Sequence, residues 1–255
     1  MSLTDTLKTE YLKILSGYDI NFFDRTTVVE GIAGYSDIFL PGAPAEWKSG
    51  RRVMIVGRET RGWKRPASTG SYDTLERHID AMVECHTNFS ARHGSKKKQN
   101  RGETFWNFMR SVGDIVGDGN VAWCNLFCMD FKDTMPQPWQ PHYDTVKSLS
   151  AQLLKAEINV LQPDVIIFAN GGASVLVRRE FFPLSGPESV CTDWRLVGKF
   201  DKTKLERFTL YGSIDCYRIN HPSSISRENR AARTLLLEHL RSTFAASVQR
   251  SAIRQ

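Results

Sequence analysis

Three polar side chains with complementary chemistry lie at or just after the ends of apolar runs: a carboxylate at Glu59, an amide at Asn125 and an imidazole at His221. A carboxylate can position water or stabilise a cation, and an imidazole can donate to a group that is gaining negative charge. An amide both donates and accepts hydrogen bonds, so it can read the edge of a bound ring. The set is suited to acid–base or electrostatic catalysis, provided that the fold brings the three together.

Four apolar runs rich in β-branched residues indicate the strands of an α/β fold. The runs are "RRVMIVG" (51–57), "NVAWCNLF" (120–127), "DVIIFA" (164–169) and "IDCYRI" (214–219). Three of them are almost continuously hydrophobic, which is typical of parallel strands covered on both faces, so we expect a four-stranded parallel sheet. Ligands bind at the carboxyl ends of such strands. We therefore expect Glu59, Asn125 and His221 to face one crevice.

Apolar residues at helical spacing outside the runs predict helices and show where these helices end. A stripe of apolar side chains ends before Pro163, and residues 226–248 predict a packed C-terminal helix that is capped by Ser226. The segment 64–101 contains a basic run, "ARHGSKKKQNR", and the segment 183–213 is rich in proline, glycine and charge. We interpret both segments as surface insertions.

Size, charge and cysteine content limit the class of protein. A chain of 255 residues is about the upper size of one domain, so we expect a single α/β domain over residues 1–255. The net charge of +6 favours an anionic partner, with nucleic acid foremost. Because neither a signal peptide nor a membrane-spanning run is apparent, we expect a soluble, cytoplasmic protein. Five cysteines without a C-x-x-C pair predict buried thiols rather than disulfides or a metal site.

Two hexapeptides carry a family resemblance: "GRETRG" (57–62) after the first run and "HPSSIS" (221–226) after the last. Between them, "ETFWNFMRSVGDIVGDGNVAWCN" has the form of a helix followed by a strand that ends in Asn125, and "PDVIIFANGGAS" resembles a third core strand with its turn. The order of these motifs resembles the uracil-DNA glycosylase superfamily, whose first motif is G-Q-D-P-Y-H and whose last is H-P-S-P-L-S. The resemblance implies a three-layer αβα sandwich. It covers approximately residues 51–63, 103–130, 163–175 and 214–240.

The resemblance also implies catalytic roles. Breaking the bond between a base and its deoxyribose passes through a cation-like sugar while negative charge develops on the departing base. By resemblance, Glu59 serves the cation and positions water, and His221 donates to an oxygen of the base. Asn125 would read a base swung out of the helix, with Gly57 and Trp63 beside it in the base-binding set.

Contacts with DNA outside the base pocket follow from the same resemblance. Ile225 stands where the family carries a leucine wedge, which fills the gap that the flipped base leaves in the stack. Ser223 and Ser224 are suited to gripping flanking phosphates, and Arg61 completes the DNA-binding set. The implied partner is DNA, bound by a monomer without metal, cofactor or membrane.

Departures from the family pattern bear on the substrate. Glu59 replaces an aspartate, and Arg61 stands where many members carry a tyrosine that excludes a 5-methyl group. A guanidinium at that place suits an oxygen-rich adduct or a phosphate. We therefore expect the substrate to be uracil or a bulky modified pyrimidine, such as modified cytosine in phage DNA. The second substrate would make the protein an antiviral defence enzyme instead of a DNA repair enzyme.

Each motif also has a structural alternative. Glu59 can pair with Arg58 or Arg61, and the His-Pro pair can be a hydrogen-bonded strand end. Asn125 can satisfy backbone groups, and Trp63 can fill the core. Two other functions stay open: a module that binds a modified base without cutting it, and an N-glycosidase for nucleosides or nucleotides.

Overall fold

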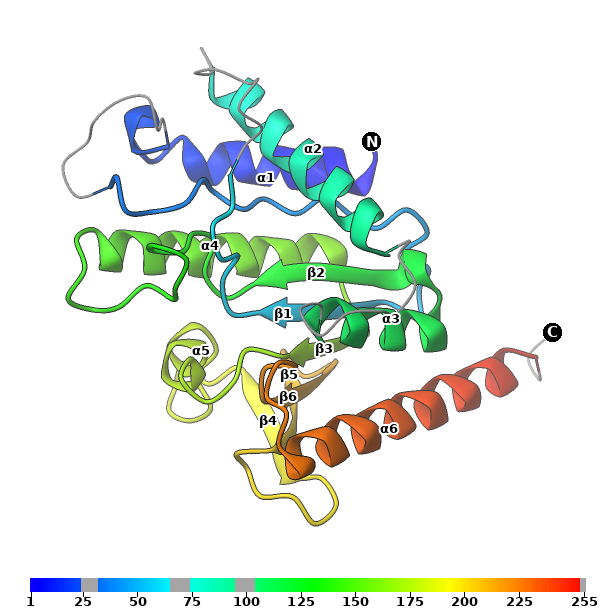
Figure 1. The fold of residues 1–255 in the computed structure, drawn as a ribbon. Coiled ribbons are helices and arrows are strands. Elements are labelled where there is room, and N and C mark those ends of the chain that lie inside the picture. The colour runs from blue at the N-terminus through cyan, green and yellow to red at the C-terminus, as the bar shows by residue number, and fades with distance from the viewer. Residues whose placement is uncertain (24–31, 65–73, 95–103, 253–255) are drawn as a thin grey trace. The chain divides into compact units, whose positions relative to one another are not determined.

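A computed structural model describes residues 1–23, 32–64, 74–94 and 104–252 (Figure 1). The chain divides into two compact units. Unit 1 is formed by Met1–Ala43, Arg58–Arg92 and Cys124–Gln162, and unit 2 by Pro44–Gly57, His93–Trp123 and Pro163–Gln255. Because the chain passes between the units several times, neither unit is a continuous segment. The single domain expected over residues 1–255 stays a prediction.

Unit 1 is mainly helical in its described residues. Its elements are α1 (Leu3–Leu15), η1 (Ile20–Phe22), most of α2 (Leu75–Gly94) and α4 (Tyr143–Leu161). α1 packs against α4 and begins with a capping box, in which the hydroxyl of Ser2 accepts from the backbone N–H of Asp5 at 3.1 Å. The stripe expected before Pro163 is buried in α4, which confirms that helix. It consists of Val146, Leu149, Leu153 and Leu161.

The helix α2 corrects the interpretation of 64–101 as a surface insertion, at least over its described residues. The helix has a buried face, so it belongs to the core of unit 1. This face consists of His78, Ile79, Met82, Val83 and His86. Two histidines on the face interrupt the apolar periodicity, which is why the sequence pattern did not show a core helix. Most of the basic run at 91–101 lies outside the described residues.

Unit 2 contains a sheet of six strands in the order β2-β1-β3-β6-β5-β4 (Figure 1). They are β1 (Val53–Gly57), β2 (Val121–Asn125), β3 (Val165–Phe168), β4 (Cys191–Leu196), β5 (Leu205–Leu210) and β6 (Ile214–Ile219). The last two residues of β2 are assigned to unit 1. Four of the strands, β1, β2, β3 and β6, lie within the four apolar runs, so those predictions are confirmed.

The strands β1, β3 and β6 form the parallel part of the sheet. Val53 of β1 pairs with Val165 of β3, which pairs with Asp215 of β6. Every residue of β1 and β3 is buried, as expected for parallel strands covered on both faces. Parallel strands end at a common edge, so the residues that follow Gly57, Phe168 and Ile219 start from the same edge of the sheet.

The sheet is larger than the four parallel strands expected, because β4 and β5 lie within 183–213 and join it in antiparallel pairing. The interpretation of 183–213 as a surface insertion is therefore wrong. β5 buries Phe208 and Leu210. Tyr211 and Gly212 then have φ of 51° and 72°, the positive values that a tight hairpin turn uses, and the chain returns as β6. The fold is α/β with a mixed sheet.

The remaining described helices support the sheet of unit 2. They are α3 (Thr104–Val116), η2 (Asp118–Asn120), α5 (Val175–Phe181) and α6 (Arg227–Ala252). α3 packs against α6 and β1, and α6 also contacts β5 and β6. The predicted cap is confirmed, because Ser226 Oγ accepts from the backbone N–H of Asn229 at 3.2 Å. Four of the five cysteine side chains are buried in the protein, as predicted. Over the described ranges, no helix has both the length and the apolar character needed to cross a membrane.

Candidate active site

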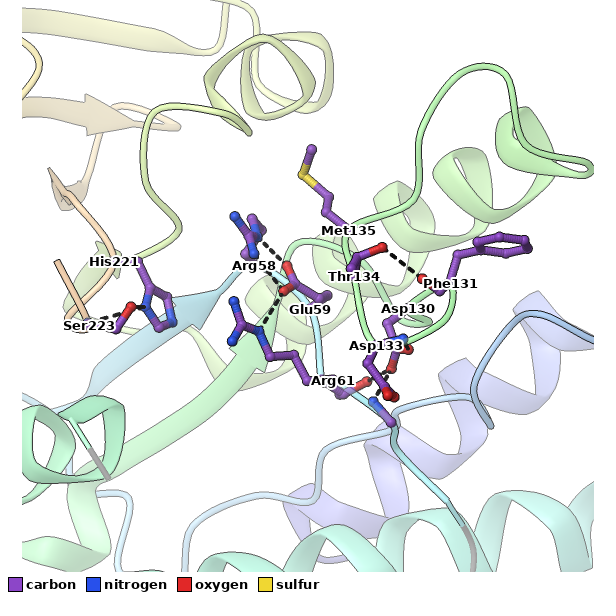
Figure 2. Close-up of polar contacts among 12 residues, drawn as sticks. Arg58, Glu59, Arg61, Asp130, Phe131, Asp133, Thr134, Met135, His221 and Ser223 are labelled. Atoms are coloured by element: carbon purple, nitrogen blue, oxygen red, sulfur yellow. Dashed lines mark hydrogen bonds and ion pairs between the residues drawn. The ribbon is translucent and has the colours of Figure 1, made fainter. Parts of the chain in front are cut away.

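Glu59 lies in unit 1 shortly after β1, and two arginines bind its carboxylate (Figure 2). Arg58 donates from Nη2 to Oε1 at 2.8 Å and from Nε to Oε2. Arg61 donates from Nε to Oε1 at 3.3 Å. The hydrogen bonds to Glu59 raise the pKa of Arg58 above its usual value. Only 2% of the Glu59 side chain is exposed, and both of its oxygens accept from cations in this conformation.

Asp130 fixes the loop that carries these side chains. Its buried carboxylate accepts from the hydroxyl of Thr60 at 2.9 Å and from the backbone N–H of Gly62 at 2.7 Å. Gly62 has a φ of 80°, and a Cβ at this position would lie 2.5 Å from Oδ1 of Asp133, so the loop requires glycine. Asp130 was missed in the sequence, because a lone acidic residue outside the strand-end motifs carries no pattern.

The segment after β2 lies beside the same loop in unit 1. The backbone N–H of Phe127 donates to the carbonyl of Arg58 at 3.0 Å, which joins the segments that follow β1 and β2. Asn125, the last residue of β2, is buried. Trp63 is also buried, and its ring has an edge contact with Phe39 at a centroid distance of 5.1 Å. This contact fits the structural alternative for Trp63, packing in the core.

His221 lies in unit 2, shortly after β6, and its Nδ1 accepts hydrogen bonds from Ser223 (Figure 2). The hydroxyl of Ser223 lies 2.7 Å from Nδ1, and the backbone N–H of Ser223 donates to the same atom at 3.3 Å. A backbone N–H can only donate, so this contact favours the tautomer in which Nδ1 accepts and Nε2 carries the proton. His221 is therefore a hydrogen-bond donor at Nε2.

An aromatic cluster from α3 and β2 supports the imidazole within unit 2. Phe105 stacks on the His221 ring, with 5.8 Å between the centroids and 13° between the planes. Phe105 also contacts Trp123 of β2 at 6.1 Å, and Trp106 contacts Trp123 at 5.0 Å. Sequence reasoning did not select Phe105, because helical spacing alone does not show which aromatic side chain of α3 reaches the end of β6.

Polar contacts hold the H-P-S-S-I-S loop against the start of α6. The backbone N–H of Ser224 donates to the carbonyl of His221 at 2.8 Å. The side-chain amide of Asn229 donates to Ser224 Oγ, and Arg233 donates to the Ser224 carbonyl at 3.0 Å. In this anchored loop, Ile225 keeps 67% of its surface exposed.

Asn170, after β3, is a further residue that sequence reasoning missed. It is fully buried, and neither Oδ1 nor Nδ2 has a hydrogen-bond partner among the residues that the structure describes. The next residue, Gly171, has a φ of 78°, and a Cβ there would lie 3.6 Å from the backbone nitrogen of His221. The signal that could have found Asn170 is its place at a strand end, which it shares with Glu59 and His221.

The residues expected to form the site are divided between the two units. Glu59, Arg61, Trp63 and Asn125 belong to unit 1, and Gly57, His221, Ser223, Ser224 and Ile225 belong to unit 2. Unit 1 brings the Glu59 loop together with the segment after β2, and unit 2 brings His221 together with Ser223. The crevice expected for Glu59, Asn125 and His221 stays a prediction. Comparisons with protein-family models and with curated proteins find no match to the chain.

Proposed function

We propose that the protein is a monofunctional DNA glycosylase, which flips a base out of DNA, hydrolyses its N-glycosidic bond and leaves an abasic site. The observation that carries the proposal is the arrangement around His221. Its imidazole lies at the carboxyl edge of the parallel strands, with Nδ1 bound to Ser223 and its ring supported by Phe105. A preorganised donor of this kind suits the departure of an anion from a sugar.

In the proposed reaction, the bond between the anomeric carbon and the base nitrogen breaks, and its electron pair leaves with the base. Nε2–H of His221 donates a hydrogen bond to a base oxygen as negative charge develops there. The oxygen of a water molecule then bonds to the cation-like anomeric carbon. The proton that this water releases ends on the departed base, so charge and atoms balance.

Glu59 is assigned to the sugar cation and to the attacking water. Arg58 and Arg61 both bind its carboxylate, so this role requires an ion pair to open when DNA binds. Arg61 is the better candidate to move, because 64% of its side chain is exposed. A DNA phosphate is a strong competing acceptor for its guanidinium. Phosphate binding by Arg61 would then increase the negative charge available at Glu59.

The family resemblance also supplies the proposed DNA contacts and the proposed substrate. The exposure of Ile225 suits a wedge in the base stack, and Ser223 and Ser224 are assigned to flanking phosphates. The proposed substrate is uracil or, because Arg61 replaces a tyrosine of the family, a bulky modified pyrimidine such as modified cytosine. The first substrate fits DNA repair, and the second fits defence against phage.

Oligonucleotides that each carry one altered base test the proposal. Uracil, thymine opposite guanine, and hydroxymethylated or glycosylated cytosine are placed in single- and double-stranded DNA, and alkali then cuts every abasic site. Cutting at the altered base by the wild-type chain, but not by His221→Ala purified in parallel, supports the proposal and excludes a contaminating glycosylase. Absence of cutting on all these substrates contradicts it.

A second candidate is a module that binds a modified base in DNA without cutting it. The ion pairs of Glu59 favour this candidate, because a carboxylate neutralised by two arginines stabilises a cation poorly. Tight, base-selective binding without product over hours would decide for the module. A nucleoside or nucleotide N-glycosidase is distinguished by competition, since a mononucleotide would then compete as well as long DNA.

A further inference from the structure

We infer that Asn170 determines which base the protein accepts, by hydrogen bonding to the edge of a base bound beside His221. This inference rests on the proposed function, because it names a residue that recognises the base in the same site. It adds a second amide to Asn125, the residue to which the family resemblance assigns base reading.

The first observation is the unsatisfied amide of Asn170. The side chain can donate two hydrogen bonds and accept at its oxygen, yet neither atom has a partner among the described residues. The residue is 0% exposed, so bulk solvent does not reach the amide. Buried polar groups in proteins are nearly always paired, and an unpaired one destabilises the fold. Its presence is explained if a ligand supplies the partners.

The second observation is the location of this amide within unit 2. β1, β3 and β6 are parallel, so Gly57, Asn170 and His221 lie at the same edge of the sheet, where ligands of such folds bind. The turn that begins at Asn170 lies against the backbone of His221, since a Cβ on Gly171 would be 3.6 Å from the His221 nitrogen. A base whose oxygen accepts from His221 therefore binds next to an amide that lacks partners.

The chemistry of the amide fits a pyrimidine edge. A carboxamide presents a donor and an acceptor side by side, which can bind the N3–H and O4 of uracil or, rotated, the N3 and amino group of cytosine. The turn itself does not need this side chain. Ser174 Oγ donates at 2.8 Å to the backbone carbonyl of Asn170, a contact that any residue at this position would keep.

The test compares Asn170→Ala and Asn170→Asp with the wild-type chain in binding to oligonucleotides. Each oligonucleotide carries one 2′-fluoro nucleotide with uracil or 5-hydroxymethylcytosine, because fluorine destabilises a sugar cation and prevents cutting. An unmodified oligonucleotide of the same sequence measures general DNA affinity. The matched control is Asn220→Ala, which removes an amide that donates to Asn229 at 2.9 Å.

The inference predicts that Asn170→Ala binds the preferred altered base at least about ten-fold more weakly, with unchanged affinity for unmodified DNA. Its melting temperature stays the same or rises, because no hydrogen bond is lost, whereas Asn220→Ala melts lower and still discriminates between bases. Asn170→Asp, which only accepts, shifts the preference from uracil towards the amino-bearing base.

Equal base discrimination by Asn170→Ala and the wild-type chain overturns the inference, as does a wild-type chain that distinguishes none of the bases. A lower melting temperature with equal losses for all three oligonucleotides also overturns it, because that result assigns Asn170 a structural role. The proposed glycosylase activity fails separately if the wild-type chain selects a base but never cuts unfluorinated DNA. The inference then holds for a base-binding module.

Discussion

The ring of Phe105 lies over the ring of His221, with 5.8 Å between the centroids and 13° between the planes. The contact reaches His221 from α3, whereas Ser223 binds Nδ1 from the adjoining loop. Phe105 therefore fixes the plane of the imidazole, and Ser223 fixes which nitrogen carries the proton. Both constraints orient Nε2–H before a base arrives, which is how a hydrogen bond contributes most to a transition state.

Phe105→Leu removes the flat surface under His221 but keeps an apolar side chain of similar volume. We expect the single-turnover rate of base excision to fall by roughly 10- to 100-fold, because a misplaced donor stabilises the departing base poorly. Phe105→Tyr keeps the stacked ring and should retain most of the rate. Thermal unfolding of both variants checks the fold, and equal rates for the Leu and Tyr variants would contradict the role given to stacking.

The parallel strands could be predicted from sequence because their physical signature is local. A strand buried on both faces consists almost entirely of apolar, β-branched residues, as in β1 and β3. β4 lacks this signature, because five of its six residues are exposed. The turn before β6 uses Tyr211 and Gly212 instead of the Asn-Gly or Asp-Gly pairs that mark a hairpin, so β5 was also missed.

The residues of the candidate site also differ in whether the sequence alone could predict them. Glu59 and His221 were found because each follows a strand run and lies in a hexapeptide that resembles a family motif, and both features can be read from the sequence alone. The roles of Asp130 and Asn170 depend on tertiary structure. Asp130 binds a loop about 70 residues away in the chain, and the missing partners of Asn170 exist only once it is buried. Neither property leaves a local pattern.

Glu157 of α4 makes stability depend on pH. Burial raises the pKa of its carboxyl from 4.5 to about 8, although the nearby Cys124 thiol and Tyr11 hydroxyl act in the opposite direction. Between these values the folded state binds the proton more tightly than the unfolded state. The stabilising effect is therefore complete below about pH 4.5 and is lost as pH rises towards 8.

Glu157→Gln keeps the shape of the side chain and removes this titration. Urea unfolding from about pH 5 to about pH 8 should show a steep loss of stability in the wild-type chain and a flatter profile in the variant. The exposed Glu238 provides the control, since Glu238→Gln should follow the wild-type profile. Parallel profiles for all three proteins would show that the Glu157 carboxyl does not titrate in this range.

Arg178 and Glu206 form a buried ion pair in unit 2. Their nitrogen and oxygen atoms lie 2.9 Å apart, and both side chains are 2% exposed. Desolvation by burial lowers the pKa of Arg178. The guanidinium also lies over the rings of Phe168 and Phe208, at 5.6 and 4.8 Å from their centroids. Glu206→Gln leaves this cation without its counter-charge, and we expect it to reduce the free energy of unfolding by about 3–5 kcal/mol.

Chemical denaturation compares this loss of unfolding free energy with the loss that follows when an exposed ion pair is broken. Lys204 and Glu228 lie 3.2 Å apart with 69% of the Glu228 side chain exposed, so Glu228→Gln should cost less than about 1 kcal/mol. If Glu206→Gln and Glu228→Gln lower stability equally, the Arg178 charge does not depend on Glu206 for compensation.

The most direct measurement of the central claim is the single-turnover rate of base excision by the wild-type chain and by His221→Ala, with protein in excess over the best oligonucleotide substrate. His239→Ala, on α6, serves as the matched histidine control. We predict that His221→Ala lowers the rate by roughly 10²-fold or more while its melting temperature and its affinity for unmodified DNA stay close to those of the wild-type chain. Equal rates for His221→Ala, His239→Ala and the wild-type chain would contradict the assignment of His221 as the donor to the departing base.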